Sequence, residues 1–378
     1  MKKKVLLLGN HGFVIYNFRK ELIQRLLKDD YEVYISLPYD EKVDLMISWG
    51  CKFVETNVDR RGTNPATDLR LVGHYVKILR DIKPDVVLTY TIKPNLYGGI
   101  ACRMLNIPCI NNITGLGSGF SGNPTLKFLL SSLYKVGLKK SKCVFFQNIE
   151  DMNSLVQKNI VKGPYELIPG SGVNLNEYKF IEFPPEDNLN FIFIGRIMKD
   201  KGIDQYLEAA REVKIMYPKV NFNVIGFIEK SQSQYNELID KYVEEGYINY
   251  LGYQSDVKPY IQASSCLIQP SHGGEGLSNV LLETAATGRA LIASNIPGCR
   301  ETIEEGVNGY TFKKKNTQSL VNKIEQFINL SYAEKKEMGN KSRMKMEKKF
   351  SRDVVVNAYM KEIENAKEIT SELQKANS

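Results

Sequence analysis

The sequence predicts an α/β protein with two doubly wound domains, each a parallel sheet covered by helices on both faces. Short apolar runs alternate with longer segments whose apolar residues recur at helical spacing, as in successive β–α–β units. This alternation occurs twice, on either side of an irregular, proline-containing stretch from Pro169 to Asn188. The length of 378 residues allows two domains of ordinary size. We therefore expect two parallel sheets.

The first domain is predicted to span residues 1–170. Apolar residues repeat at helical spacing in segments such as Val14–Lys28 and Asp68–Ile82, which we expect to be helices. The expected strands are the short apolar runs between such segments, namely Val5–Gly9, Glu32–Pro38, Cys51–Thr56, Asp85–Tyr90, Cys109–Thr114, Cys143–Asn148 and Tyr165–Pro169.

The second domain is predicted to span residues 171–350. Its expected strands are Asn190–Gly195, Asn221–Gly226, Ile248–Gly252, Ser265–Pro270 and Ala290–Ser294. The remaining residues, 351–378, form one long helical segment, which we expect to cross back to the first domain. Two such Rossmann-like domains facing each other would enclose a cleft at the carboxyl ends of their strands, where open α/β sheets bind ligands.

The composition is typical of a cytoplasmic globular protein. Hydrophobic residues make up 43% of the chain and charged residues 25%, and no apolar run is long enough to cross a bilayer. The run Val5–Leu8 after the N-terminal lysines is too short for the core of a signal peptide. The six cysteines lack the paired spacing of disulfides or metal ligands, which indicates buried thiols in a reducing compartment.

The positive charge is concentrated in the first half of the chain. Residues 1–170 hold 24 Lys and Arg against 15 Asp and Glu, whereas the rest of the chain is close to neutral. Residues 86–149 contain seven basic residues and no acidic one. Such a surplus favours a polyanionic partner, whether lipid headgroups, phosphate or nucleic acid.

A glycine-rich turn between a predicted strand and a predicted helix forms the first candidate site. Gly276, Leu277 and Ser278 should present backbone N–H groups at the start of that helix, which suits a phosphate. Glu275 just before the helix and Glu283 two turns into it should lie on about the same face. Two such carboxylates could flank a diphosphate and accept hydrogen bonds from sugar hydroxyls. Alone, the pair also fits one capping and one solvated glutamate.

A second segment places two cations at the end of a strand. Gly195-Arg196 ends the expected strand Asn190–Gly195, and Lys201 follows before the next helix. Together the two cations could neutralise the charge that develops on a departing nucleoside diphosphate. Alone, each also fits a solvated surface charge.

Taken together and in their order along the chain, the two segments resemble the signature of family 4 retaining glycosyltransferases of GT-B fold. The resemblance lies in Gly195-Arg196, Lys201-Gly202 and the Glu275–Glu283 spacing, and it extends over nearly the whole chain. Within the family, the first half is similar to bacterial enzymes that extend polyprenyl-diphosphate-linked glycans. These include N-acetylgalactosaminyltransferases of protein N-glycosylation and transferases of capsule and O-antigen synthesis. The motifs in question are Tyr16–Arg19, Asn64–Pro65, Gly115–Ser118 and Gly172–Asn174.

The resemblance implies a role for each matching residue on the donor side. Arg196 and Lys201 would hold the diphosphate of a nucleotide sugar, which we expect to be a UDP-sugar carrying a hexose or an N-acetylhexosamine. Glu275 would contact the sugar and Glu283 the ribose. The remaining donor-site candidates are glycines and neighbouring residues of the loops, namely Gly12, Gly195, Tyr253, Gly276, Leu277 and Ser278. Gly12 would let the backbone approach the reacting centre. No cofactor is implied.

On the acceptor side the resemblance implies a lipid-linked glycan bound by the first domain. Many family members carry a histidine in the loop after the fourth strand, where this chain has Tyr90–Asn95 instead. Lys93 or Asn95 could take its place. The acceptor-binding candidates are polar or basic residues of this half: Asn17, Arg19, Arg60, Arg61, Lys93 and Asn95.

The acid-free stretch also bears on the mechanism. A double displacement needs a carboxylate nucleophile beside the anomeric carbon, and the loops after Tyr90 and Thr114 contain none. Front-face substitution is therefore favoured, with the leaving phosphate taking the acceptor's proton. No metal ion is expected, because the basic pair replaces the cation and no Asp-x-Asp motif falls in these loops.

Other readings of the sequence are less well supported. Residues 117–122 form a G-x-G-x-x-G, but no acidic residue follows about 20 positions later, as a dinucleotide site would need. The three histidines lack metal-ligand spacing, and the basic half lacks a nucleic-acid reader motif. A GT-B-type epimerase or phosphorylase, and a non-catalytic polyanion-binding protein, stay open as alternatives.

A lysine-rich amphipathic helix is expected over residues 123–142. Its apolar residues could lie on lipid while its lysines meet phosphates, or the apolar face could pack on the sheet as in any doubly wound domain. The basic surplus favours contact with an anionic membrane surface. We therefore expect the protein on the cytoplasmic face of the inner membrane, as a peripheral protein.

Overall fold

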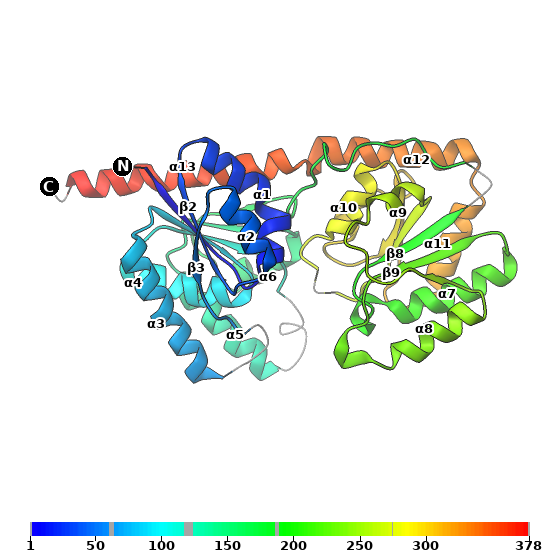
Figure 1. The fold of residues 1–378 in the computed structure, drawn as a ribbon, viewed down its shortest axis with the longest axis horizontal. Helices are drawn as coiled ribbons and strands as arrows, with labels where there is room; N and C mark the ends of the chain where they lie inside the picture. Colours follow the sequence, from blue (N-terminus) through cyan, green and yellow to red (C-terminus); the bar gives the residue numbers. More distant parts are fainter. Residues whose placement is uncertain (1, 60–63, 117–123, 186–188, 274, 377–378) are drawn as a thin grey trace. The chain divides into compact units, whose positions relative to one another are not determined.

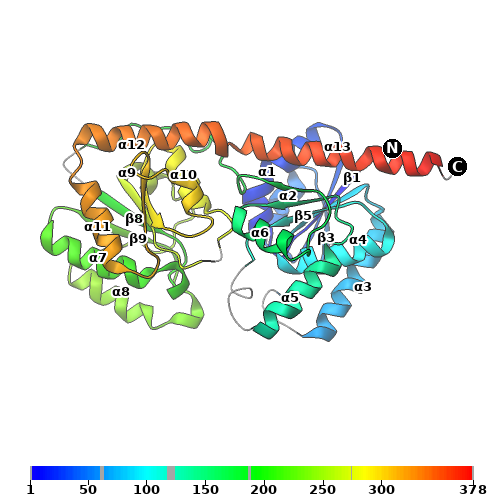
Figure 2. The same cartoon turned by 180° about the vertical axis from the view of Figure 1, so that it is seen from behind.

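The computed structural model describes residues 2–59, 64–116, 124–185, 189–273 and 275–376. The chain forms two compact units. Unit 1 comprises Met1–Ser171 and Asp353–Ser378, and unit 2 comprises Gly172–Arg352. Each unit is a parallel sheet with helices on both faces, as expected from the sequence (Figures 1 and 2).

The sheet of unit 1 has seven strands in the order β3-β2-β1-β4-β5-β6-β7. All seven correspond to apolar runs predicted from the sequence. Their bounds are β1 Lys4–Leu8, β2 Glu32–Leu37, β3 Lys52–Glu55, β4 Val86–Tyr90, β5 Cys109–Ile113, β6 Cys143–Phe146 and β7 Tyr165–Leu167. The strand order reverses between β1 and β4, and the carboxyl ends of these two strands are therefore where a ligand is expected to bind.

The helices of unit 1 bury their apolar sides against the two faces of this sheet. One face is covered by α1 (Gly12–Lys28), α2 (Glu41–Ser48) and α13 (Arg352–Ala376), and the other by α3 (Pro65–Ile82), α4 (Gly99–Leu105), α5 (Pro124–Gly137) and α6 (Ile149–Gln157). A π-helical turn, η1 (Pro94–Gly98), precedes α4. Asn64 and Asn148 cap α3 and α6 through their side chains, which satisfies backbone N–H groups that a helix start leaves open.

Unit 2 has six strands in the order β10-β9-β8-β11-β12-β13. They are β8 Asn190–Ile194, β9 Asn221–Ile225, β10 Asn249–Tyr250, β11 Cys266–Gln269, β12 Ala290–Ser294 and β13 Gly309–Phe312. The edge strand β13 was not predicted, because its four residues lie between turns and lack a longer apolar run. In the sheet of unit 2, the strand order reverses between β8 and β11.

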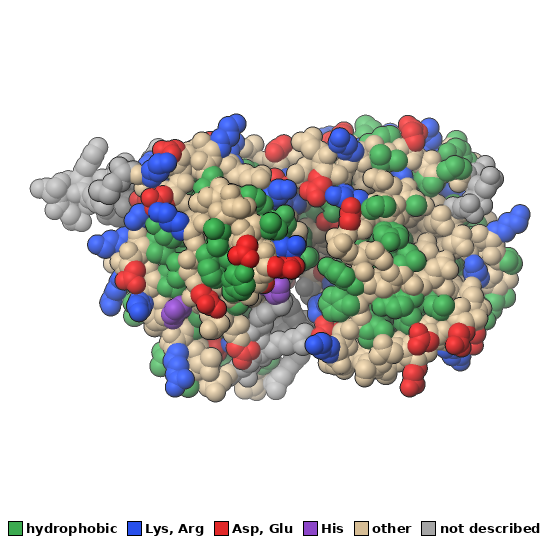
Figure 3. All heavy atoms as spheres, in the orientation of Figure 1, with side chains coloured by type: hydrophobic (Ala, Val, Ile, Leu, Met, Phe, Trp, Pro, Cys, Tyr) green, Lys and Arg blue, Asp and Glu red, His purple; other side chains and the backbone are tan. Residues whose placement is uncertain are grey.

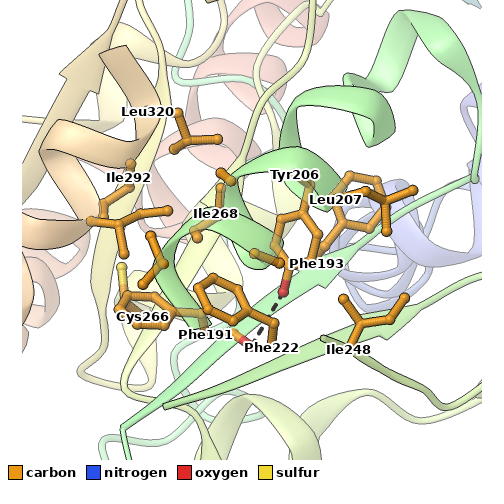
Figure 4. Packing of buried hydrophobic residues seen from close by; sticks show 14 of the residues in the cluster. Phe191, Phe193, Tyr206, Leu207, Phe222, Ile248, Cys266, Ile268, Ile292 and Leu320 are labelled. Carbon is orange, nitrogen blue, oxygen red and sulfur yellow. Dashed lines mark hydrogen bonds between the residues drawn. The ribbon is translucent and has the colours of Figure 1, made fainter. Parts of the chain in front are cut away.

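Aromatic residues fill much of the core on one face of this second sheet (Figure 4). Phe191 and Phe222 stack with ring centroids 5.1 Å apart, and the Tyr206 hydroxyl donates to the carbonyl oxygen of Phe191 at 3.3 Å. The helices on this face are α7 (Ile203–Met216), α8 (Tyr235–Glu244) and α11 (Thr317–Ile328). The other face packs against α9 (Lys258–Ala263), α10 (Asn279–Ala286) and the π-helical turn η6 (Met346–Phe350) that follows α12 (Tyr332–Lys345).

The final helix, α13, begins directly after Ser351, which pairs with Val173 of unit 2. Six residues of α13 are buried in the core of unit 1: Val355, Val356, Tyr359, Met360, Ile363 and Ala366. This stripe recurs at helical spacing, which explains why the last segment packs on the first sheet rather than fraying.

The lysine-rich helix is shorter than the predicted 123–142. α5 ends at Gly137, and its continuation is a turn in which the Ser141 N–H donates to the Leu138 carbonyl oxygen. Asn123 lies outside the described residues. Among the helices that the structure describes, none combines the length and the apolar character that a bilayer-crossing helix requires.

Candidate functional site

In unit 2, the two predicted site segments lie at the carboxyl ends of adjacent strands. Arg196 and Lys201 follow β8, and Glu275 follows β11, which pairs with β8 in parallel. The strand order reverses between these strands. The structure therefore brings together, at the point where open α/β sheets bind ligands, side chains that are more than 70 residues apart in the sequence.

Lys201 and Glu275 form an ion pair through Nζ and Oε1. Lys201 ends a 3-10 turn, and Gly202 after it has a φ of +75° where an added Cβ would run into the Pro270 carbonyl. The Ser271 hydroxyl donates to the same Glu275 oxygen at 2.7 Å. Both charged side chains are largely shielded from solvent, so each fixes the position of the other.

Arg196 lies at the same edge and is more exposed. Its Nη1 is 3.0 Å from Oε2 of Glu229, a residue after β9 that the sequence analysis did not single out. Gly195 donates its N–H to the Ile225 carbonyl, which fixes the turn that carries Arg196. The cation is thus held by a carboxylate from a neighbouring loop.

The expected phosphate seat at Gly276–Ser278 is wrong in part. α10 begins at Asn279, and the Ser278 N–H donates to the Gly298 carbonyl oxygen at 2.8 Å. Leu277 is buried in the core. Gly298 has a φ of +82°, and an added Cβ would come within 2.8 Å of Cβ of Glu275, so a glycine is required for this loop to pack there.

Glu283 is the fifth residue of α10, little more than one turn into the helix rather than two. We predicted that Glu275 and Glu283 would lie on about the same helical face. Glu275 precedes the helix, so the two carboxylates do not share one. Burial raises the pKa of Glu283 to about 7, and a hydrogen bond with Tyr178 and the positive charge of Arg352 oppose that shift. Glu283 is therefore a carboxyl group that can change its charge near neutral pH.

Tyr253 is an exposed aromatic residue after β10. Its ring lies edge-on to that of Phe227, with centroids 6.3 Å apart, and both rings are exposed. Gly252 before it has a φ of +66°, a conformation that favours glycine. This pair of rings offers a surface on which a nucleobase could stack.

In unit 1, Gly12 is the glycine that we expect to let the backbone approach the reacting centre, and its N–H group already has a partner. The Gly12 N–H donates to Oδ2 of Asp40 at 2.7 Å, and an added Cβ at this glycine would run into the same carboxylate. Asp40 lies after β2, so the start of α1 is occupied by a carboxylate of the protein itself. Gly12 is required for that contact, and its expected role beside the reacting centre stays a prediction.

Two acceptor candidates on α1 have different surroundings. Asn17 is partly exposed, and its Nδ2 donates to the Phe13 carbonyl at 3.0 Å. Arg19 is only 3% exposed, and its guanidinium lies over the rings of Tyr90 and Tyr359, 4.6 and 5.6 Å from their centroids. The prediction that Arg19 contacts the acceptor is therefore wrong for this structure, because α13 covers it.

The loop after β4 is held together by polar contacts within unit 1. Lys93 forms an ion pair with Asp68 at 2.7 Å. Asn95 is buried, accepting from the Thr89 hydroxyl and donating to the Asn112 carbonyl oxygen. We predicted that these two side chains would be open to the acceptor, but both are already engaged by groups of unit 1. The other two candidates, Arg60 and Arg61, lie outside the described residues.

Sequence reasoning missed the partners of the site residues. Asp40, Glu229 and Ser271 all come from loops at the carboxyl ends of strands, and each fixes a predicted residue. The available signal was their position directly after an expected strand, but the strand order that makes them neighbours cannot be read from a single chain. Among the described residues, no three His, Cys, Asp or Glu side chains converge as metal ligands would.

The candidate residues lie in two Rossmann-like units, and comparisons with known proteins identify these as the two domains of a glycosyltransferase of GT-B fold. The family model "Glycosyl transferases group 1" matches residues 175–345, and "Glycosyl transferase 4-like" matches residues 4–148. The chain belongs to these glycosyltransferases.

A curated relative from Campylobacter jejuni is named N,N'-diacetylbacillosaminyl-diphospho-undecaprenol alpha-1,3-N-acetylgalactosaminyltransferase. It is 27% identical over 335 residues, which cover 84% of this chain and 87% of the relative.

Solved structures of similar proteins establish the fold. A glycosyltransferase from Rickettsia africae superposes with a TM-score of 0.81 at 19% identity, covering 97% of this chain and 98% of that one. The Anabaena protein HepE, in complex with UDP, superposes with a TM-score of 0.78 at 18% identity, covering 97% of this chain and 100% of HepE.

Proposed function

We propose that the protein is a retaining glycosyltransferase that moves a hexose or an N-acetylhexosamine from a UDP-sugar to a polyprenyl-diphosphate-linked glycan. The observation that carries this proposal is the grouping of Arg196, Lys201 and Glu275 at one sheet edge of unit 2. The name of the Campylobacter relative supports a lipid-linked acceptor, and the HepE complex supports UDP. The product would be an extended glycan of the cell surface or of a glycoprotein.

On the donor side, the diphosphate lies against Arg196 and Lys201. Charge-assisted hydrogen bonds from two cations suit a phosphate pair, and they strengthen as negative charge grows on the leaving group. Glu275 orients Lys201 through their ion pair and accepts a hydrogen bond from the donor sugar. Glu283 accepts from the ribose, and the ring of Tyr253 borders the base.

The transfer proceeds with retention at the anomeric carbon. The bond from that carbon to the phosphate oxygen breaks and its electron pair stays on the phosphate. The acceptor hydroxyl oxygen forms the new bond on the same face, and its proton passes to the departing phosphate. Arg196 and Lys201 stabilise that phosphate in place of a metal ion. The chemistry therefore needs no carboxylate nucleophile and no cofactor.

We also propose that α5 brings unit 1 to an anionic membrane surface, where a lipid-linked acceptor resides. The last turns of the helix are packed, with Tyr134 and Gly137 buried, whereas Phe128 in the second turn is 76% exposed and Leu129 is 54% exposed. α5 therefore cannot lie flat along its whole length, and its first half is the part available to lipid. Elsewhere too, apolar side chains reach the surface of unit 1 among charged ones (Figure 3).

The positive charge of α5 and the residues after it also supports contact with an anionic membrane. Four lysines in and just after α5 are exposed, namely Lys127, Lys135, Lys139 and Lys140, and residues 86–149 contain no acidic residue to offset them. Each lysine near an anionic bilayer contributes roughly 1 kcal/mol, which salt weakens. Phe128 and Leu129 add apolar contact below the headgroups. Together they support reversible, peripheral binding at the cytoplasmic face.

Vesicle co-sedimentation tests the membrane proposal. The wild-type protein should sediment with vesicles of anionic lipid at low salt and much less at high salt. Changing Lys135, Lys139 and Lys140 together to Gln should weaken binding. The matched control changes three exposed lysines of unit 2, Lys313, Lys314 and Lys315, to Gln and should leave binding nearly unchanged. Equal losses in the two triple variants would contradict a role for α5.

A screen of nucleotide sugars tests the catalytic proposal. Each candidate is incubated with a polyprenyl-diphosphate-linked sugar, and the products are identified by mass, with the anomeric configuration read by NMR. A glycosylated lipid with retained configuration and released UDP supports the proposal. A changed nucleotide sugar in the absence of acceptor would instead indicate an epimerase. Binding without release of nucleoside diphosphate would indicate a non-catalytic protein.

A further inference from the structure

We propose that His11, Phe13 and Asp40 form a carbohydrate subsite in unit 1, where a sugar ring lies against Phe13 and offers a hydroxyl to His11. The inference deepens the proposed function and rests on it for the source of that sugar, which is either the acceptor glycan or the donor. None of the three residues belongs to the motifs that the sequence analysis linked to sugar binding.

The subsite lies at the point of unit 1 where a ligand is expected. His11 is the third residue after β1, and the strand order reverses between β1 and β4. Thr91, directly after β4, has a φ of +72°, which is rare for a β-branched residue. Its hydroxyl is buried and has no hydrogen-bond partner within the described residues. Such backbone strain is typically kept at functional sites.

Asp40 organises the subsite by joining two helix starts. Its Oδ2 accepts from the N–H groups of Gly12 at 2.7 Å and Phe13 at 3.3 Å, and its Oδ1 accepts from the N–H of Lys42 at 3.0 Å. α1 and α2 are neighbours, as Figure 1 shows. Because a carboxylate already occupies the start of α1, this surface disfavours phosphate and favours a neutral ligand.

The position of Asp40 determines which way His11 presents its nitrogens. Nδ1 of His11 is 3.0 Å from Oδ2 of Asp40 and 3.1 Å from the backbone nitrogen of Phe13. The Phe13 N–H donates both to Nδ1 of His11 and to Oδ2 of Asp40, which fixes the orientation of the imidazole ring. Nε2 is the ring nitrogen left for a ligand hydroxyl, which can both donate and accept a hydrogen bond. It has no partner in the part of the chain that the structure describes, and the side chain is 38% exposed.

Phe13 supplies the apolar part of the subsite. Its ring is 45% exposed although it is large and apolar, and it lies edge-on to the His11 ring, with centroids 6.3 Å apart. Asn17, one turn further along α1, lies on the same side of the helix as Phe13. An exposed aromatic face beside an imidazole and an amide suits a sugar, whose C–H face is apolar and whose hydroxyls are both donors and acceptors.

Saturation-transfer NMR on the full chain tests sugar binding directly. The probes are free glucose, galactose, N-acetylglucosamine and N-acetylgalactosamine. At least one should receive saturation from the wild-type protein, and Phe13→Ala and His11→Asn should each reduce the effect severalfold. Asn is chosen at position 11 because it still caps a helix. Tyr165→Ala and His74→Ala are the controls, because both residues are exposed and lie outside the proposed sites, and both variants should keep the effect.

The inference is overturned if no probe binds, or if the two subsite variants behave like the controls. Kinetics then identify the source of the sugar. A rise of about tenfold in the acceptor KM of both variants, with the donor KM unchanged, assigns the subsite to the acceptor, and the reverse assigns it to the donor. Normal values for both KMs would also overturn it. If the wild-type protein transfers no sugar at all, the proposed function fails, and the NMR result still decides whether the subsite exists.

Discussion

Removing the ammonium group of Lys201 should lower kcat/KM of transfer by a factor of about 10² to 10³. In the proposed mechanism the group stabilises charge that develops on the leaving diphosphate, and loss of one such donor typically costs about 2.7–4 kcal/mol of transition-state stabilisation. Each 1.36 kcal/mol corresponds to a factor of about ten. The fold should survive Lys201→Ala, because the residue lies in a 3-10 turn and packs in no core cluster.

The ion pair with Glu275 makes a sharper prediction about the double variant. Lys201→Ala leaves the Glu275 carboxylate largely shielded from solvent and without its cation, where it repels the incoming diphosphate. Glu275→Gln removes that charge while keeping an acceptor for the Ser271 hydroxyl. The combined loss in Lys201→Ala/Glu275→Gln should therefore be smaller than the sum of the single losses, by roughly 0.5–3 kcal/mol.

The assay is a steady-state measurement of UDP release and product mass for the wild type, both single variants and the double variant. Lys199→Ala is the matched control, because Lys199 is an exposed lysine of the same turn, and it should retain near-normal activity. Thermal unfolding of every variant shows whether losses come from the fold. Strictly additive single losses would refute the coupling, and near-normal turnover of Lys201→Ala would refute its assignment to the donor phosphate.

Three further predictions follow from the structure. Burial raises the pKa of Glu283 from its ordinary value near 4.5 to about 7, so the folded state keeps a proton over a range in which the unfolded state has lost it. Its ionisation therefore lowers stability as pH rises, and Glu283→Gln should gain in Tm relative to the wild type between pH 5 and 8; an unchanged difference would contradict this. Transfer activity should persist in excess chelator, and full loss restored by Mg²⁺ or Mn²⁺ would contradict the role of the basic pair. Tyr359→Ala should cost about 3–5 kcal/mol in urea unfolding, because the ring is buried and holds α13 on unit 1, whereas Tyr165→Ala at an exposed edge should cost much less.

The elements that could be predicted from the sequence are those with a local signature. All seven strands of unit 1 are apolar runs of four or more residues or lie beside a clear turn, and each reversal of strand order falls between strands that carry predicted site loops. β13 escaped prediction because its four residues, Gly309–Phe312, carry too short a pattern. The end of α5 at Gly137 was missed for a similar reason, since Leu138 continues the apolar spacing while the backbone has already turned.

Residue roles were predictable only where one segment determines them. Arg19 resembles a surface residue of an amphipathic helix, and it is buried because α13, more than 300 residues later, packs over it. Lys93 likewise resembles an open cation until α3 supplies Asp68. In both cases the deciding partner comes from a distant segment, and nothing within the local sequence could reveal it.

Partners from distant segments also form the sheet edge in each unit where a ligand is expected to bind. In each unit a positive group at the end of a strand meets a carboxylate from another loop at the same edge: the start of α1 meets Asp40, Arg196 meets Glu229 and Lys201 meets Glu275. The contacts fix donors and cations in place before a substrate arrives, which lowers the ordering cost of binding. The two edges also differ in the charged groups that they present. Asp40 occupies a potential phosphate site in unit 1 and leaves neutral hydrogen-bonding groups beside Phe13, whereas unit 2 keeps two cations at one edge. These contacts support the proposals that the first edge binds a sugar hydroxyl and the second a diphosphate.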